Sequence, residues 1–264
     1  GVFMADYPAL LLVLYLFVFL FGSVIGSFLN VVIYRLPRGI SFVSGRSFCP
    51  ACREQLKAWD MIPCVSWLLL RGRCRFCHSP ISRRYPAVEL FCGLLAVAVL
   101  GVYGCTWQAA AFFALLVALV AVALIDWDTM EIPNGLVLYL LFPACALVVL
   151  DITVIGFIPT LVLHGCGFMA VAAPLYLLTL LIPDSFGGGD IKLMAVCGLA
   201  VGWRLIVVAG FIALIFGGGY GVYLLIGKKA DRKSHFAFGP FLVLGIILSC
   251  LAGEPLLSWY LSLL

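Results

Sequence analysis

Residues 107–128, WQAAAFFALLVALVAVALIDWD, decide the fold class. Residues 107–125 contain no charged side chain, and a helix of that length rises about 28 Å, close to the roughly 30 Å of a bilayer's hydrocarbon core. Asp126 then ends the apolar run. The stretch therefore predicts a membrane-spanning helix that finishes at an acidic residue.

The rest of the chain has the same character. Of its 264 residues, 65% are hydrophobic and 11% are charged, whereas a soluble domain carries about 25% charged residues. The other apolar segments of suitable length are 9–33, 86–104, 134–150, 155–182, 190–203, 205–227 and 237–262. Together with 107–126 they predict an all-α polytopic membrane protein with about eight transmembrane helices. This composition excludes a soluble enzyme, and it excludes a nucleic-acid-binding protein despite the net charge of +4.

The basic residues predict the orientation in the membrane. Segment 35–84 carries ten of the sixteen Lys and Arg residues, and segment 228–233 carries four more. Short loops rich in Lys and Arg stay in the cytoplasm, and eight spans place both segments on that side. Both termini are then expected outside. These basic residues either only set the topology or also contact anionic lipid headgroups.

Four cysteines form two close pairs, in FCPAC at 48–52 and RCRFC at 73–77. Two C-x2-C pairs supply the four thiolates of a tetrahedral zinc ion. A loop of about 50 residues is too small to bury a core of its own, so a structural metal would replace that core. We therefore predict structural Zn²⁺ at Cys49, Cys52, Cys74 and Cys77, with free or disulfide-bonded thiols as the alternative. A reducing cytoplasm favours the metal.

Two acidic positions stand at the ends of predicted spans. Asp126 ends one, with Asp128 two residues on, and Asp190 begins another directly after the glycines 187–189. Two carboxyls in one low-dielectric site share a proton. Such a pair supplies a general base that activates water and a general acid that protonates a departing amine. The alternative is that these acids are interfacial caps and topology markers.

The order of the motifs resembles one family. FGGGD at 186–190 resembles the GxGD motif of intramembrane aspartyl proteases, and the whole chain is similar to the bacterial type IV prepilin peptidases. The matching blocks are the two C-x2-C pairs, GSFLNVVIYRLP at 26–37, SRRYPAVEL at 82–90, LIDWDTMEIPN at 124–134, GGGDIKLM at 187–194 and FGPFL at 238–242. They follow the family order and cover nearly the whole chain.

The resemblance implies a membrane aspartyl protease of the bacterial inner membrane. Such enzymes cleave the basic leader of prepilins and pseudopilins after a glycine at the cytoplasmic face. It implies Asp126 and Asp190 as the catalytic pair, with Asp128 as the competitor for the first position. Asp126 is preferred because it stands six residues before Ile132. The residues expected to support the pair are Gly187, Gly189, Lys192 and Asp128.

Many members also methylate the new N-terminal amine with S-adenosylmethionine. The resemblance alone suggests the residues near that cofactor, which are Gly26, Asn30, Arg35, Tyr85 and Glu89. It implies a methyltransferase-associated region at 1–104, with its cytoplasmic loop at 35–85, and a protease core at 105–264. Pilus or secretion assembly machinery and membrane lipids are the further partners expected. A peptidase without methyl transfer, or a transporter with an acidic ion pathway, would be the alternatives.

Overall fold

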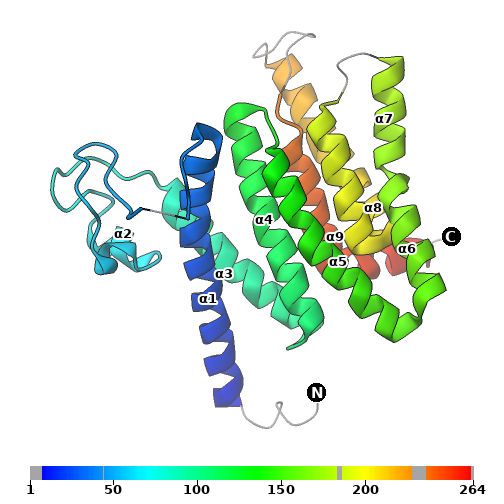
Figure 1. The fold of residues 1–264 in the computed structure, drawn as a ribbon, viewed down its shortest axis with the longest axis horizontal. Coiled ribbons are helices and arrows are strands. Elements are labelled where there is room, and N and C mark those ends of the chain that lie inside the picture. The colour runs from blue at the N-terminus through cyan, green and yellow to red at the C-terminus, as the bar shows by residue number, and fades with distance from the viewer. Residues whose placement is uncertain (1–7, 44, 183–185, 228–235, 263–264) are drawn as a thin grey trace. The chain divides into compact units, whose positions relative to one another are not determined.

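The computed structural model describes residues 8–43, 45–182, 186–227 and 236–262. The chain divides into two compact units, Gly1–Gly104 and Cys105–Leu264 (Figure 1). The long helices of the first unit are α1 (Pro8–Arg35) and α3 (Arg84–Tyr103), and its loop carries the short elements η1 (Leu36–Arg38), η2 (Ala58–Met61) and α2 (Val65–Leu69). The second unit contains α4 (Trp107–Thr129), α5 (Asn134–Ile155), α6 (Phe157–Ala170), α7 (Ala172–Leu181), α8 (Gly188–Ile226) and α9 (Gly239–Leu261).

The predicted fold class is confirmed. Within the described residues, seven helices are long and apolar enough to cross a membrane. Because their exposed surfaces are rich in Leu, Phe and Val, a lipid environment accounts for side chains that water would not accommodate. The chain is therefore a multi-pass membrane protein.

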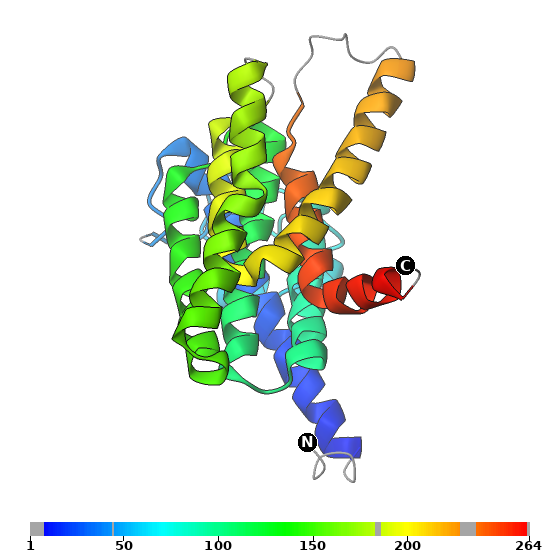
Figure 2. The ribbon, with the colours of Figure 1, turned by 90° about the vertical axis from the view of Figure 1, so that its right-hand side faces the viewer.

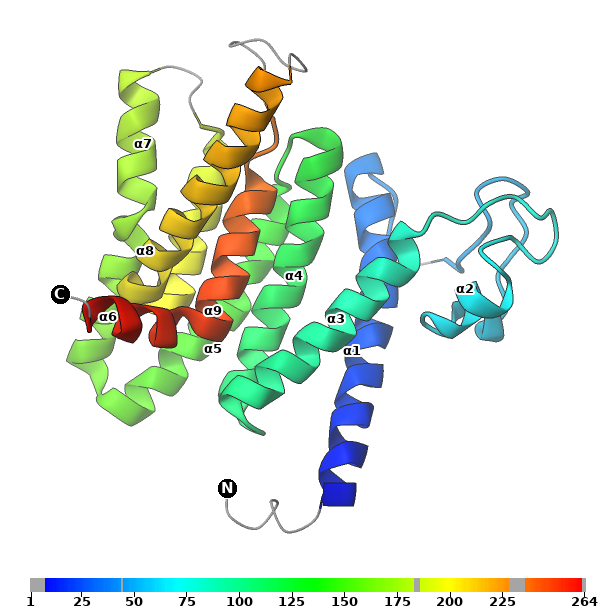
Figure 3. The ribbon, with the colours of Figure 1, turned by 180° about the vertical axis from the view of Figure 1, so that it is seen from behind.

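In the first unit, α1 and α3 pack closely through small residues. A Cβ atom added at Gly22 would lie 2.6 Å from the carbonyl oxygen of Cys92, and one added at Gly26 would lie 2.9 Å from the Cβ atom of Cys92. Since hydrophobic burial drives little association between helices in lipid, such close backbone approach supplies the packing instead. These glycines therefore fix how the two helices cross (Figure 3).

In the second unit, α8 consists of two helical halves, which correspond to the predicted spans 190–203 and 205–227. Gly202 interrupts it with φ 79° and ψ 169°, a conformation outside the helical region. Figure 2 shows the half after this break returning toward the end where α8 begins. The seven long helices of the described residues therefore contain the eight predicted spans, because the two halves of α8 correspond to two of them. The predicted span 155–182 is in turn divided into α6 and α7.

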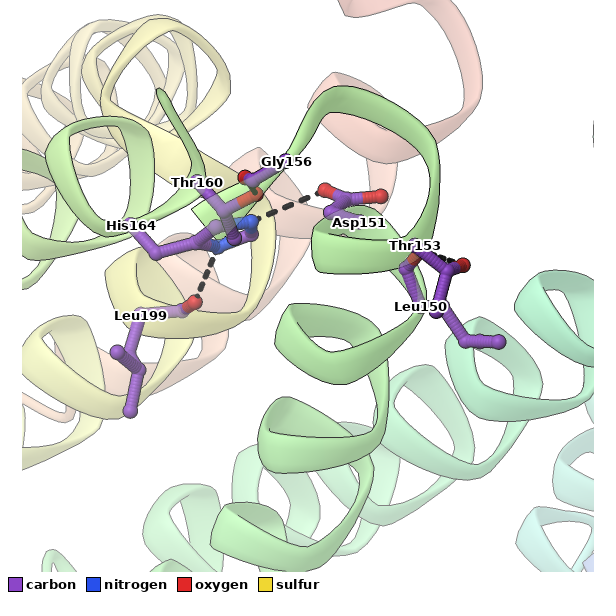
Figure 4. A network of polar contacts seen from close by, with 7 residues as sticks. All are labelled: Leu150, Asp151, Thr153, Gly156, Thr160, His164 and Leu199. Carbon is purple, nitrogen blue, oxygen red and sulfur yellow. Dashed lines mark hydrogen bonds and ion pairs between the residues drawn. The ribbon is translucent and has the colours of Figure 1, made fainter. Parts of the chain in front are cut away.

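A buried polar contact lies next to the break in α8 (Figure 4). The side chain of His164 on α6 is buried, and its Nδ1 lies 2.6 Å from the carbonyl oxygen of Leu199. Its Nε2 lies 3.0 Å from Oδ2 of Asp151 on α5. The carbonyl oxygens in the turn before a helix break lose their usual backbone N–H partners. At Leu199 the His164 ring takes the place of that missing partner. Asp151 orients the ring, because its Oδ2 lies within hydrogen-bonding distance of the second ring nitrogen.

Replacing His164 by alanine is expected to destabilise the second unit by about 2–4 kcal/mol, because Asp151 and a buried carbonyl would lose their partner. Thermal unfolding of the purified protein in detergent measures the change. The control is Thr153→Ala, because the exposed Thr153 hydroxyl donates only within its own helix, to the carbonyl of Leu150. Equal stability of the two variants would contradict the role given to His164.

Candidate active site and metal centre

Four segments of the second unit meet at one end of its helix bundle. α4 ends there at Thr129, α5 begins at Asn134, and α8 and α9 begin at Gly188 and Gly239 (Figure 1). Asp126 and Asp190 both lie at this end with little exposure, 5% and 8% respectively. The fold therefore brings together two carboxyls that are 64 residues apart in the sequence.

Asp126 lies in the last turn of α4 and contacts the first residue of α9. Its Oδ2 accepts a hydrogen bond of 3.0 Å from the backbone N–H of Gly239. A Cβ atom added at Gly239 would lie 2.6 Å from the same oxygen. Asp128, by contrast, is exposed. Burial thus distinguishes Asp126 from its competitor.

Asp190 occupies the first turn of α8. Its Oδ2 accepts a hydrogen bond of 3.3 Å from the backbone N–H of Gly187. Gly189 packs on the turn between α4 and α5, where an added Cβ atom would lie 2.9 Å from the Cβ atom of Ile132. The glycine before Asp190 therefore lets α8 approach the segment that follows Asp126.

The two carboxyls are both buried at the end of the bundle where α4 ends and α8 begins. Like charges in a desolvated site do not ionise together readily, so such a pair holds one proton between its members. One member can then accept a proton while the other donates one. This arrangement is suited to water activation and leaving-group protonation without a covalent intermediate.

Lys192 lies two residues beyond Asp190 and joins α8 to α5. Its Nζ donates a hydrogen bond of 3.1 Å to Oδ1 of Asn134, the first residue of α5. The acceptor in this bond is an amide oxygen rather than a carboxylate. This bond links the start of α8 to the turn that follows Asp126.

Aromatic rings around this end were missed by the sequence reasoning, because they stand in four separate segments. Phe186 lies 5.5 Å from Phe238, and Tyr220 on α8 lies 5.3 Å from Phe241 and 6.1 Å from Trp127, measured between ring centroids. Aromatic pairs at such distances stabilise one another. These ring contacts hold the segment before α9 in place. They thereby also position the backbone N–H of Gly239, which donates to Asp126. The FGPFL block at 238–242 was the one sequence signal that pointed here.

Alanine at Gly189 is expected to reduce catalysis about tenfold to a hundredfold, since its methyl group would push Ile132 and shift Asp190, and small misplacements of reacting groups are costly. Gly188→Ala is a matched control one residue away, because an added Cβ atom there meets nothing within 4 Å. Initial cleavage rates of the two variants make the comparison. Equal losses at both positions would show that chain flexibility rather than the contact with Ile132 matters.

The loop of the first unit brings the four cysteines together. Their sulfur atoms all lie within 4.8 Å of one another, and Sγ of Cys49 lies 3.9 Å from Sγ of Cys77. A tetrahedral zinc ion with Zn–S bonds of about 2.3 Å requires sulfur separations of about 3.8 Å. A disulfide would instead hold its sulfurs about 2.05 Å apart. The cluster thus has the size and donor chemistry to hold a metal ion.

Each cysteine pair stands in the same kind of turn. The N–H of Cys49 donates to the carbonyl of Glu54, and the N–H of Cys74 donates to that of Ser79, at 2.9 Å in both cases. The residue after each second cysteine, Arg53 or His78, has a positive φ of 60° or 57°. His78 therefore has a backbone role as the counterpart of Arg53, consistent with its place outside the predicted ligand set.

Hydrogen-bond donors near the cluster lower the pKa of the Cys49 thiol and so favour its thiolate form. The N–H of Cys52 lowers the pKa of the Cys49 thiol to about 6, with a further contribution from the Ser79 hydroxyl. Hydrogen bonds from Ser79 likewise lower the pKa of Cys77. Metals bind the thiolate form, so these donors favour coordination.

Replacing Cys74 by serine is expected to remove most of the bound metal and to unfold the loop, since a structural zinc ion contributes folding free energy directly. Metal analysis of the purified protein should find about one zinc ion per chain in the wild type. Cys105→Ser serves as the control, because Cys105 is an exposed cysteine outside the cluster. Full zinc content in Cys74→Ser would contradict the assignment.

The five residues suggested for the methyl donor gather where α1 ends and α3 begins. Nδ2 of Asn30 donates to the carbonyl of Tyr85 at 3.1 Å, and Oε2 of Glu89 accepts from the N–H of Cys64 at 2.7 Å. The guanidinium of Arg35 donates to two loop carbonyls, those of Ser41 and Arg46. Gly26 lies in the α1–α3 contact described above. These contacts give all five residues a part in holding the unit together, Tyr85 through its backbone carbonyl.

Known proteins match the chain over most of its length. The family model "Bacterial Peptidase A24 N-terminal domain" matches residues 20–103, and "Type IV leader peptidase family" matches residues 112–222. A protein of Stutzerimonas stutzeri is 35% identical, with 91% of each chain covered. One of Aeromonas hydrophila is 33% identical with 93% of each covered, and one of Bacillus subtilis is 31% identical with 93% of this chain and 97% of that one covered.

All three relatives are named "Prepilin leader peptidase/N-methyltransferase". No solved structure matches the chain. The resemblance drawn from the motifs is confirmed, because both family models and relatives above 30% identity cover the two units. The chain belongs to the type IV leader peptidase family.

Proposed function

We propose that this chain cleaves the leader peptide from type IV prepilins or pseudopilins and then methylates the new N-terminal amine. The observation that carries the peptidase half is the placement of Asp126 and Asp190, both buried, at one end of the second unit. The family and the names of the relatives support the same activity. The enzyme class is therefore an aspartic endopeptidase of the membrane.

The pair of carboxyls supplies both proton transfers of amide hydrolysis. The ionised member takes a proton from water as its oxygen bonds to the scissile carbonyl carbon. The protonated member gives its proton to the amide nitrogen, so the C–N bond breaks and the amine leaves neutral. The N–H groups of Gly239 and Gly187 hold the two side chains in place throughout.

We place this site at the cytoplasmic face of a bacterial inner membrane. The sequence that joins α8 to α9 carries Lys228, Lys229, Arg232 and Lys233, which lie outside the described residues. Basic links of this length stay in the cytoplasm, and α9, which follows the link, begins at Gly239 in contact with Asp126. Both termini would then lie outside, as expected from the sequence.

We assign methyl transfer to the first unit. S-adenosylmethionine, when bound, supplies the methyl group from a cationic sulfonium, and an acidic side chain is a suitable partner for such a cation. Glu89 is buried and uses one oxygen for Cys64, while a carboxylate can accept about four hydrogen bonds. Tyr85 stands four residues before Glu89 on α3, on the same side of the helix, and is partly exposed. The residues that would surround the donor are Gly26, Asn30, Arg35, Tyr85 and Glu89.

In this proposal the four cysteines hold zinc in a structural role. A complete thiolate set leaves no open coordination position for a substrate. The ion would hold together a loop that lacks a core, so the residues at the start of α3 keep their places. Zinc content and leader cleavage can therefore be measured as separate properties.

The test uses the purified full-length chain in nanodiscs with a prepilin and S-adenosylmethionine, followed by mass spectrometry of the pilin. The expected product lacks the leader after a glycine and carries one added methyl group on its N-terminal amine. Cleavage without methylation would mean that the chain is a peptidase without methyltransferase activity. An uncleaved prepilin, with the protein folded and zinc-loaded, would overturn the proposed function.

A further inference from the structure

A patch of exposed apolar side chains lies on the loop of the first unit, outside the long helices. Five large side chains define it, and we call them the α2 patch: Trp59, Ile62, Val65, Leu68 and Leu69. Trp59 is 66% exposed, and Leu69 is 78% exposed. Within α2, Val65, Leu68 and Leu69 stand at positions i, i+3 and i+4, so these three side chains form one stripe. A stripe of this kind facing water would be costly, because each side chain would remain hydrated.

The opposite side of the same helix is held firmly. Nε1 of Trp67 donates to the carbonyl of Ile81 at 3.2 Å, and the Trp67 ring packs against Gly72. The backbone N–H of Cys64, the residue before α2, donates to Oε2 of Glu89 on α3 at 2.7 Å. Cys64 has φ 59°, unusual for a residue other than glycine. These contacts fix the orientation in which α2 presents its apolar stripe.

The bond between Cys64 and Glu89 also fixes the depth of α2. Glu89 stands five residues after Arg84, where α3 begins, which is about 7.5 Å along the helix axis. α3 is one of the candidate membrane spans. α2 therefore starts beside the first turns of a membrane helix and not beyond its end. Figures 1 and 3 agree, since α2 lies lower than both the end of α1 and the start of α3.

The charges near the patch suit a phospholipid surface. The exposed side chains of Arg71 and Arg73 follow α2 directly, where lipid phosphates would pair with them. Asp60, the acid within the stretch that carries the patch, pairs with Arg75 through bonds of 2.9 and 2.7 Å from its guanidinium nitrogens. Its negative charge is thus compensated beside the apolar stripe.

We propose that the α2 patch inserts into the headgroup–acyl boundary of the bilayer that α1 and α3 cross. Interfacial helices bury their apolar face about 5–10 Å into this boundary, comparable with the distance of about 7.5 Å between Glu89 and the start of α3. Trp59 is of the residue type enriched at such boundaries. The zinc loop is then anchored to the lipid at α2 as well as through its two membrane helices. This inference holds whether or not the proposed enzymatic function is correct.

The test places a photoreactive benzophenone amino acid at Leu69 in the full-length chain, reconstituted in phosphatidylcholine–phosphatidylglycerol nanodiscs. Since Leu69 is 78% exposed, the replacement leaves the packed contacts of the loop intact. The control carries the same amino acid at Glu54, an exposed position of the same loop outside the patch. After illumination, mass spectrometry of the modified peptide identifies what each position touches.

The expected result is a lipid adduct at Leu69 at least ten times more abundant than the adduct at Glu54. A crosslink from Leu69 to residues 105–264 would overturn the proposal, because the second unit would then cover the patch. A crosslink to a second copy of the chain would overturn it in favour of a dimer contact. Equal lipid adducts at the two positions, or none at either, would also overturn it.

Discussion

Asp126→Asn and Asp190→Asn should each lower the rate of leader cleavage by about a thousandfold or more. Asparagine keeps the size of the side chain but cannot exchange a proton with water or with the leaving amine, and general acid–base steps contribute about 10²–10⁴ in rate. When two groups act as a unit, removing either one costs nearly as much as removing both. The measurement is single-turnover cleavage of a prepilin by each single variant and by the double variant.

Two comparisons make this prediction specific. Asp128→Asn should cleave at nearly the wild-type rate, because Asp128 is exposed. Glu131→Gln is the matched control, since Glu131 is an exposed acid of the same segment. Methylation of a pilin already freed of its leader should continue in every variant if methyl transfer belongs to the first unit. Loss of cleavage in Asp128→Asn with activity kept in Asp126→Asn would reverse the assignment.

Gly239→Ala should lower cleavage about a hundredfold. The new methyl group would stand 2.6 Å from Oδ2 of Asp126 and 3.0 Å from its Cγ atom, so either the carboxyl or the start of α9 must move. A displacement of about 1 Å at a catalytic group can cost about 10² in rate. The effect should fall on kcat more than on KM, since the contact concerns a reacting group and not substrate binding.

Gly218→Ala is the control for this prediction. Gly218 is a helical glycine of α8, where an added Cβ atom meets nothing within 4 Å. Its substitution should leave the cleavage rate close to that of the wild type. If Gly239→Ala is equally active, the N–H of Gly239 does not set the position of Asp126.

The membrane fold could be predicted because apolar runs of about twenty residues are long enough to span a bilayer and seldom occur in soluble domains. The break in α8 could be predicted only in part. Hydropathy located two segments around residue 204, but the conformation of Gly202 depends on packing against α6. The bond from His164 to Leu199 joins residues 35 apart, a contact that no local pattern encodes.

For the candidate site, the sequence supplied the acids and the glycines but not what surrounds them. Asp126 and Asp190 stand out because acids at span ends are rare in so apolar a chain. Gly239 has no titratable group, and it reaches Asp126 across 113 residues of sequence. The aromatic rings near the site were hidden among many other apolar residues. The α2 patch was missed as well, because a five-residue helix is too short to give a periodic signal. The catalytic roles remain predictions.

If the two carboxyls act as one unit, a transition-state mimic should bind tightly only when both are present. The mimic is a prepilin leader peptide with a non-cleavable hydroxyl group at the scissile position, titrated into the protein in nanodiscs. Such analogues bind at least about 10²-fold more tightly than substrate. We expect tight binding to the wild type and equally weak binding to Asp126→Asn, Asp190→Asn and the double variant. Wild-type affinity in either single variant would contradict this expectation.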